Sequence, residues 1–178
     1  MIYADRIRLR AIEREDLPRF VIWLNDPEVR KGLMLYSPLS LVEEEQWFDE
    51  MLKRPIDERP FLIEVQQGEV WAPVGNCGFD KINWRCREGI MGIFIGEKQL
   101  WDQGLGTLTM NLLLRHGFNT LNLNRIALEV YENNLRAVRA YEKVGFVHEG
   151  RKREAMYKDG KYIDVLQMSI LREEWKDI

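Results

Sequence analysis

Residues 92–107 decide how the chain is interpreted, and they run Gly92-Ile93-Phe94-Ile95-Gly96-Glu97-Lys98-Gln99-Leu100-Trp101-Asp102-Gln103-Gly104-Leu105-Gly106-Thr107. An apolar run typical of a buried strand ends at Gly96, a short polar loop follows, and a helical pattern begins near Gly104. The first N–H groups of a helix lack partners within it, and glycine lets a ligand approach them closely. This stretch therefore predicts a strand–loop–helix unit that binds an anion such as phosphate, or, as the simpler alternative, a plain connection.

Two better-known phosphate-binding patterns do not fit this loop. No Gly-Lys-Ser/Thr follows Gly104, so the Walker A pattern is absent. The dinucleotide pattern requires a third glycine near Met110, and the sequence has none there.

Composition excludes several other classes of protein. The chain of 178 residues fits one domain, 1–178, and 26 basic against 29 acidic residues leave a net charge of -3, without the basic excess of nucleic-acid binders. No apolar run is long enough to span a membrane, and the N-terminal residues lack a signal-peptide core. The chain has only two cysteines, Cys77 and Cys86, which is typical of a protein in a reducing cytoplasm. These cysteines and the two histidines, His116 and His148, lack the spacing of zinc ligands, so we expect no metal site.

Apolar periodicity outlines the remaining elements. Ser40 and Glu43 form a capping box, Gly145 suits the end of a helix, and Asp159-Gly160 suits a hairpin turn. We expect strands at 7–9, 61–70, 74–82, 89–96, 126–131, 146–156 and 162–171, and helices at 16–24, 40–54, 104–118 and 135–144. The order predicts an α/β (α+β) domain with a mixed, mostly antiparallel sheet of about seven strands flanked by about four helices.

A second motif lies about thirty residues after the glycine loop, and the two together indicate a protein family. It runs Asn134…Ala137…Tyr141…Gly145-Phe146. With the glycine loop it resembles the GNAT-type N-acetyltransferases, whose loop is Gln/Arg-x-x-Gly-x-Gly/Ala. Trp101 stands at the first position here. The chain looks most like the branch that includes ribosomal-protein N-terminal acetyltransferases, over nearly its full length.

The resemblance implies acetyl-CoA as co-substrate, laid between two splayed strands at 89–96 and 126–131. Pantetheine would pair with the first strand's edge, which Gly92 and Gly96 could open through a bulge. Loop and helix N–H groups would meet the pyrophosphate, because the side chains from Glu97 to Thr107 are acidic overall. The implied cofactor-binding residues are Phe94, Ile95, Gly96, Trp101, Asp102, Gln103, Gly104, Leu105, Gly106, Thr107, Asn134, Ala137 and Arg139.

Acetyl transfer requires a proton donor for the thiolate and a proton acceptor for the amine. Tyr141 matches the family tyrosine beside the sulfur and is the expected donor. Glu129, on the strand that faces the cleft, is the expected acceptor, with Asp80 as the alternative. The Ile95 N–H can stabilise the developing oxyanion.

The acceptor is expected to be a primary amine, either a protein N-terminus or a small molecule such as a polyamine or aminoglycoside. A non-catalytic CoA-binding module is the alternative function, and a homodimer through the C-terminal strands stays open. The run Glu43-Glu44-Glu45 most simply forms a solvated helix face, and its other interpretation is attraction of a cationic acceptor. Trp84, in a turn between strands, is a candidate substrate contact.

Overall fold

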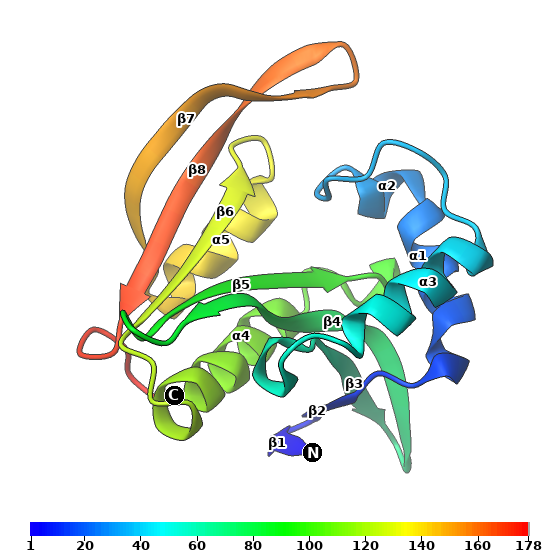
Figure 1. Cartoon of the computed structure of the whole chain (residues 1–178), viewed down its shortest axis with the longest axis horizontal. Coiled ribbons are helices and arrows are strands. Elements are labelled where there is room, and N and C mark those ends of the chain that lie inside the picture. The colour runs from blue at the N-terminus through cyan, green and yellow to red at the C-terminus, as the bar shows by residue number, and fades with distance from the viewer. Residues whose placement is uncertain (178) are drawn as a thin grey trace.

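The structure is a computed structural model, and it describes residues 1–177. It contains one eight-stranded sheet with helices on both faces (Figure 1). Its strands are β1 (Ile2–Ala4), β2 (Ile7–Ala11), β3 (Phe61–Gln67), β4 (Val70–Asn83), β5 (Glu88–Ile95), β6 (Arg125–Tyr131), β7 (Val147–Lys158) and β8 (Lys161–Leu171). Its α-helices are α1 (Leu17–Asn25), α2 (Pro27–Arg30), α3 (Leu41–Met51), α4 (Leu105–Arg115) and α5 (Leu135–Val144).

The sheet opens between two neighbouring strands in its middle. The strand order is β1-β2-β3-β4-β5-β6-β8-β7, and all neighbours are antiparallel except β5 and β6. These two pair only over Glu88–Ile90 and Arg125–Ala127. Beyond these residues β5 continues along β4 while β6 continues along β8, so the two strands diverge (Figure 1). The divergence leaves the inner edges of both strands unpaired and creates the space for a ligand.

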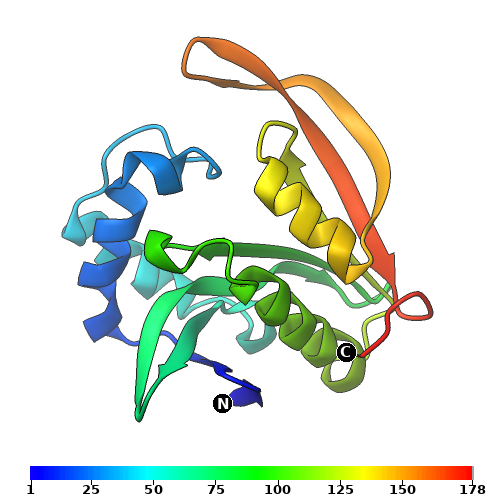
Figure 2. The ribbon, with the colours of Figure 1, turned by 180° about the vertical axis from the view of Figure 1, so that it is seen from behind.

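Apolar packing holds helices against each face of this sheet. On the face seen in Figure 2, α4 and α5 cover the main core, in which Leu112, Leu113 and Phe118 are fully buried. On the other face, α1 and α3 bury a smaller cluster that includes Phe20 and Phe48. Burial of such side chains stabilises the fold by about 1.5–3 kcal/mol each.

Local sequence signals fix where the helices begin and end. The Ser40 hydroxyl accepts a hydrogen bond from the Glu43 N–H, and the Glu43 carboxylate accepts one from the Ser40 N–H, as the capping box predicts for α3. Asn134 caps α5 and Gly145 ends it in a left-handed conformation with φ 105°. Asp26 accepts from two N–H groups at the start of α2. These caps position both walls of the opening in the sheet.

The predicted mixed sheet flanked by helices is confirmed, with three differences. Strand β1 and helix α2, each only three or four residues long, were not predicted from the sequence. The helix predicted to 118 ends at Arg115 and continues as a π-turn. The bulge lies in β4, between Phe79 and Lys81, rather than in the glycines of β5. Within residues 1–177 no helix is long and apolar enough to cross a membrane.

Candidate active site

A cleft of about 700 Å³ lies where β5 and β6 diverge. Its walls come from the end of β5, the loop before α4, the first turn of α4, and α5. Of the predicted cofactor-binding residues, ten line this cleft: Phe94, Ile95, Trp101, Asp102, Gly104, Leu105, Gly106, Thr107, Asn134 and Ala137. The glycine loop and the second motif, far apart in sequence, therefore meet at one site.

The N-terminus of α4 presents free backbone donors to the cleft. The first bond within the helix is donated by Leu108 to the Gly104 carbonyl, so the preceding N–H groups have no helical partner. Gly104 has a left-handed conformation with φ 77°, which side chains other than glycine rarely adopt. Apart from adjoining residues and the helix's own backbone, no atom lies within 4 Å of where a Cβ would stand on Gly104 or Gly106. This open, partly positive helix end fits a pyrophosphate group.

The Trp101 side chain lines the cleft and is held there by two contacts. Its Nε1 donates to the Ile95 carbonyl over 2.8 Å, and the Arg136 guanidinium stacks on its ring at 3.6 Å. The N–H of Gly96 faces β4, where it donates to the Val74 carbonyl. Since strand residues alternate in direction, Ile95 turns its backbone toward the opening. Because Trp101 occupies the Ile95 carbonyl, the Ile95 N–H is the edge group that a carbonyl of a peptide-like amide, such as those of pantetheine, can pair with.

Three predicted cofactor residues do not line the cleft. Gly96 is buried beneath Trp23, and Gln103 folds back so that its amide donates to the Gln99 carbonyl. Arg139 is exposed on α5 and lies off the cleft. The basic side chains that do line it are Lys31, Arg136, Lys143 and Lys158, against the acidic Glu28, Asp102 and Asp159. Sequence reasoning missed Lys31 and Lys158 because both come from distant elements.

Tyr141 lies at the inner end of this cleft. Its side chain packs against Phe146 with ring centroids 5.9 Å apart, and only 8% of it is exposed. Burial raises its pKa to about 12, so the hydroxyl stays protonated at neutral pH. Asn134 uses its Oδ1 to cap α5, accepting from the Ala137 N–H. Its amide nitrogen lies close to Gly32, where a Cβ would approach to 2.8 Å.

A second, larger cavity of about 1280 Å³ meets the first at Tyr141. The two cavities share seven residues: Gly32, Leu33, Ile93, Phe94, Asn134, Ala137 and Tyr141. We call this second space the acceptor cavity. Six carboxylate residues line it, Glu43, Glu44, Asp80, Glu88, Glu129 and Glu149, against three basic residues, Arg54, Arg125 and Lys152. Its wall is therefore acidic, whereas the cleft is slightly basic.

Glu44 corrects the interpretation of the acidic helix face. It is only 4% exposed and lines the acceptor cavity beside Trp47 and Phe20. Burial raises its pKa to about 7, and no side chain in residues 1–177 forms an ion pair with it. The spacing of Glu44, Phe48 and Met51 places all three on one helix face, and this signal could have located Glu44.

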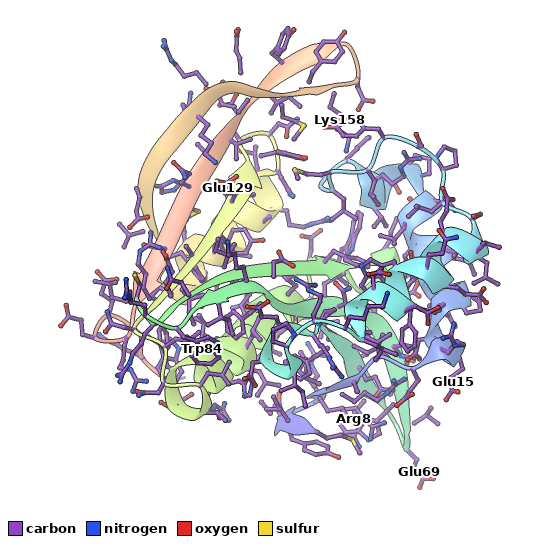
Figure 3. The ribbon with its side chains drawn as sticks, viewed as in Figure 1. Arg8, Glu15, Glu69, Trp84, Glu129 and Lys158 are labelled. Atoms are coloured by element: carbon purple, nitrogen blue, oxygen red, sulfur yellow. The ribbon has the colours of Figure 1, made fainter. Side chains whose placement is uncertain are left out.

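The two predicted proton acceptors both line the acceptor cavity. Glu129, labelled in Figure 3, forms an ion pair with Lys152 of the neighbouring hairpin. Partial desolvation raises the pKa of Asp80, against the opposing influence of the Arg54 charge. Trp84, the candidate substrate contact labelled in Figure 3, is about half exposed and lines neither cavity. Within residues 1–177 no cluster of ligating side chains could hold a metal ion.

Comparison with known proteins identifies the family. Residues 6–147 match the family model described as the acetyltransferase (GNAT) domain. The chain belongs to the GNAT acetyltransferase family. It is 32% identical to the spermidine N(1)-acetyltransferase of Vibrio cholerae over 96% of each chain. It is 29% identical to the uncharacterized N-acetyltransferase p20 of Bacillus licheniformis over 98% of this chain and 97% of that protein.

Solved structures extend the likeness to the whole fold. A crystal structure of spermidine N-acetyltransferase from Vibrio cholerae with CoA and spermine matches with a TM-score of 0.86, at 30% identity, over 95% of this chain and 97% of that one. A structure of the Vibrio cholerae enzyme described as dodecameric matches with a TM-score of 0.78, at 31% identity, over 94% and 95%. The chain is thus a GNAT N-acetyltransferase that uses acetyl-CoA. These relatives support the family but not the predicted ribosomal-protein branch.

Proposed function

We propose that the chain acetylates a primary amine of a linear polyamine, such as spermidine or spermine. The observation that carries the proposal is the buried, unpaired Glu44 in an acidic cavity that meets the acetyl-CoA cleft at Tyr141. A buried carboxylate without a partner destabilises a fold unless a ligand supplies the opposite charge. The spermidine N(1)-acetyltransferase of Vibrio cholerae, solved with CoA and spermine, supports the same acceptor class.

The residues divide the chemistry between the two cavities. Acetyl-CoA supplies the acetyl thioester. The Ile95 backbone N–H and the α4 donors orient it, and the Tyr141 hydroxyl donates its proton to the departing sulfur. Glu129 and Asp80 are the proposed acceptors for the amine proton. Asp80 suits this role because its raised pKa lies closer to the working pH. Replacing Glu129 with Gln and Asp80 with Asn separately, and recording rate against pH, identifies which one titrates.

Glu44 is proposed to bind a cationic nitrogen of the polyamine distant from the reacting one. A cation beside the carboxylate would lower its pKa and restore its charge. Trp47 and Phe20, which line the same cavity, offer apolar surface for the methylene chain.

Initial rates of thiol release with acetyl-CoA and an amine panel test this function. We expect turnover of spermidine and spermine, and little with a peptide bearing a free α-amino group or with an aminoglycoside. Glu44→Gln should raise the polyamine KM at least tenfold, whereas Glu45→Gln, a charge loss on the same helix outside the cavity, should not. Equal rates on the peptide, or an unchanged KM in Glu44→Gln, would contradict the proposal. Binding of acetyl-CoA without turnover of any amine would favour the non-catalytic module.

We also propose that copies of the chain associate in a reducing cytoplasm. The dodecameric relative supports association, and both cysteines are free thiols. The exposed strand β7 is the proposed contact. Sedimentation velocity tests the association directly, and a purely monomeric profile would contradict it.

A further inference from the structure

Lys158, at the tip of the β7–β8 hairpin, reaches across the mouth of the cleft. Its Nζ donates to the Leu33 carbonyl over 2.6 Å and also to the Arg30 carbonyl. These partners lie at and just after the end of α2, more than 120 residues earlier in the chain. Figure 3 labels Lys158 at the hairpin tip that faces the α2 region across the opening. The side chain therefore bridges the two walls of the active site.

Lys158 is buried and held in place by several contacts. Only 9% of the residue is exposed, although a lysine at a hairpin turn is ordinarily solvated. Its ammonium also lies 5.9 Å from the ring centre of Tyr131, at the end of β6. A second bridge joins the same two walls, where the Tyr36 hydroxyl contacts the Met156 sulfur. The hairpin tip is thus fastened to residues 30–36, which we call the 30–36 loop.

The 30–36 loop forms the boundary between the two cavities. Gly32 and Leu33 line both of them, while Met34 and Leu35 line the acceptor cavity. The chain just before this loop is anchored separately, because Lys98 pairs with Asp26 and Glu28. The far side of the loop is held to the hairpin by Lys158, whose carbonyl partners flank Gly32, and by the Tyr36–Met156 contact.

We propose that Lys158 is a positioning residue for the amine acceptor: by holding two carbonyls of the 30–36 loop it fixes the wall of the acceptor cavity beside Tyr141. Lys158 lines the cofactor cleft and not the acceptor cavity, so its proposed effect on the acceptor passes through the 30–36 loop. Its ammonium is occupied by loop carbonyls, so its loss acts through the loop rather than on the phosphates of acetyl-CoA. The acceptor class used in the kinetic test below rests on the proposed function.

Lys158→Met tests the proposal, with Lys161→Met as matched control. Lys161 pairs with Lys158 across the turn, is exposed, and bonds to no loop carbonyl in residues 1–177. We expect Lys158→Met to raise the acceptor KM at least fivefold, and by a larger factor than the acetyl-CoA KM, while kcat changes less than twofold. An unchanged acceptor KM, or a rise confined to acetyl-CoA, would overturn the proposal. A purely structural role would instead lower the folded fraction and therefore kcat.

Two measurements do not depend on the acceptor. Trypsin cuts after Arg30 and Lys31, inside or at the loop, and mass spectrometry should find this cleavage at least tenfold faster in Lys158→Met than in Lys161→Met. Reductive methylation of the unmodified protein should label Lys158 at least tenfold more slowly than Lys161, which requires no variant to fold. Equal cleavage or equal labelling would refute the bridge. If polyamines are not turned over but both differences appear, the proposed function fails and the bridge stands.

Discussion

Replacing Glu44 with Gln should make the unliganded protein more stable at pH 8. The pKa of Glu44 rises from an ordinary 4.5 to about 7, because burial disfavours its charged form. That rise corresponds to about 3 kcal/mol at about 1.36 kcal/mol per pKa unit. Because screening by the surroundings reduces such an effect, we expect a gain of about 2 kcal/mol. For a chain of this size the melting temperature should rise by about 4–8 °C.

The pH dependence of this gain has a definite sign. The folded protein binds the Glu44 proton more tightly than the unfolded chain, so stability falls as pH rises from about 4.5 to about 7. The advantage of Glu44→Gln should therefore shrink below about 1 kcal/mol at pH 5. Thermal melts at both pH values test this, with Glu45→Gln as control for charge loss on the same helix. A gain equal to the control, or one independent of pH, would refute the reasoning.

Three further predictions concern the cleft. Tyr141→Phe should lower kcat about 100-fold, measured by thiol release, with acetyl-CoA affinity by calorimetry unchanged. In the wild type, deprotonation of Tyr141 should cause no loss of rate below its pKa of about 12. Gly104→Ala should cost about 1–2 kcal/mol in urea unfolding because of its positive φ, whereas Gly106→Ala, with open space around its Cβ, should be neutral or stabilising. Trp101→Phe should cost about 1 kcal/mol, because it removes the donor to the Ile95 carbonyl and keeps the ring under Arg136. Equal unfolding of the two glycine variants, or of the tryptophan variant and the wild type, would contradict the geometry.

Local signals in the sequence located most of the elements, because caps and turns act over a few residues. The Ser40 capping box and Gly145 each lie where the sequence predicts them. The short β1 and α2 carry too few residues for periodicity to reveal. Their existence depends on partners elsewhere in the chain, such as Lys98 at the start of α2.

The candidate site was predictable where helix geometry decides which side chains share a face. Ala137 and Tyr141 are four residues apart and both line the cleft, but Arg139, two residues from each, turns about 200° away, and Arg136 lines the cleft in its place. The same spacing argument, applied to α3, would have placed Glu44 inward. Lys158 was beyond sequence reasoning, since its partners depend on how a distant hairpin folds back.

The short pairing between β5 and β6 also bears on solubility. An unpaired strand edge at the margin of a sheet is a template on which other chains can add strands and aggregate. Here the unpaired backbone beyond Ile90 and Ala127 lies in the interior of the sheet, with one strand's free edge flanked by the other. Of the two outer edges, β1 and β7, the β7 edge carries basic side chains at Arg151, Lys152 and Arg153, and charge on an edge strand disfavours aggregation. The fold thus keeps the unpaired backbone of β5 and β6 available to a small ligand inside the sheet, away from the β7 edge where copies of the chain are proposed to associate.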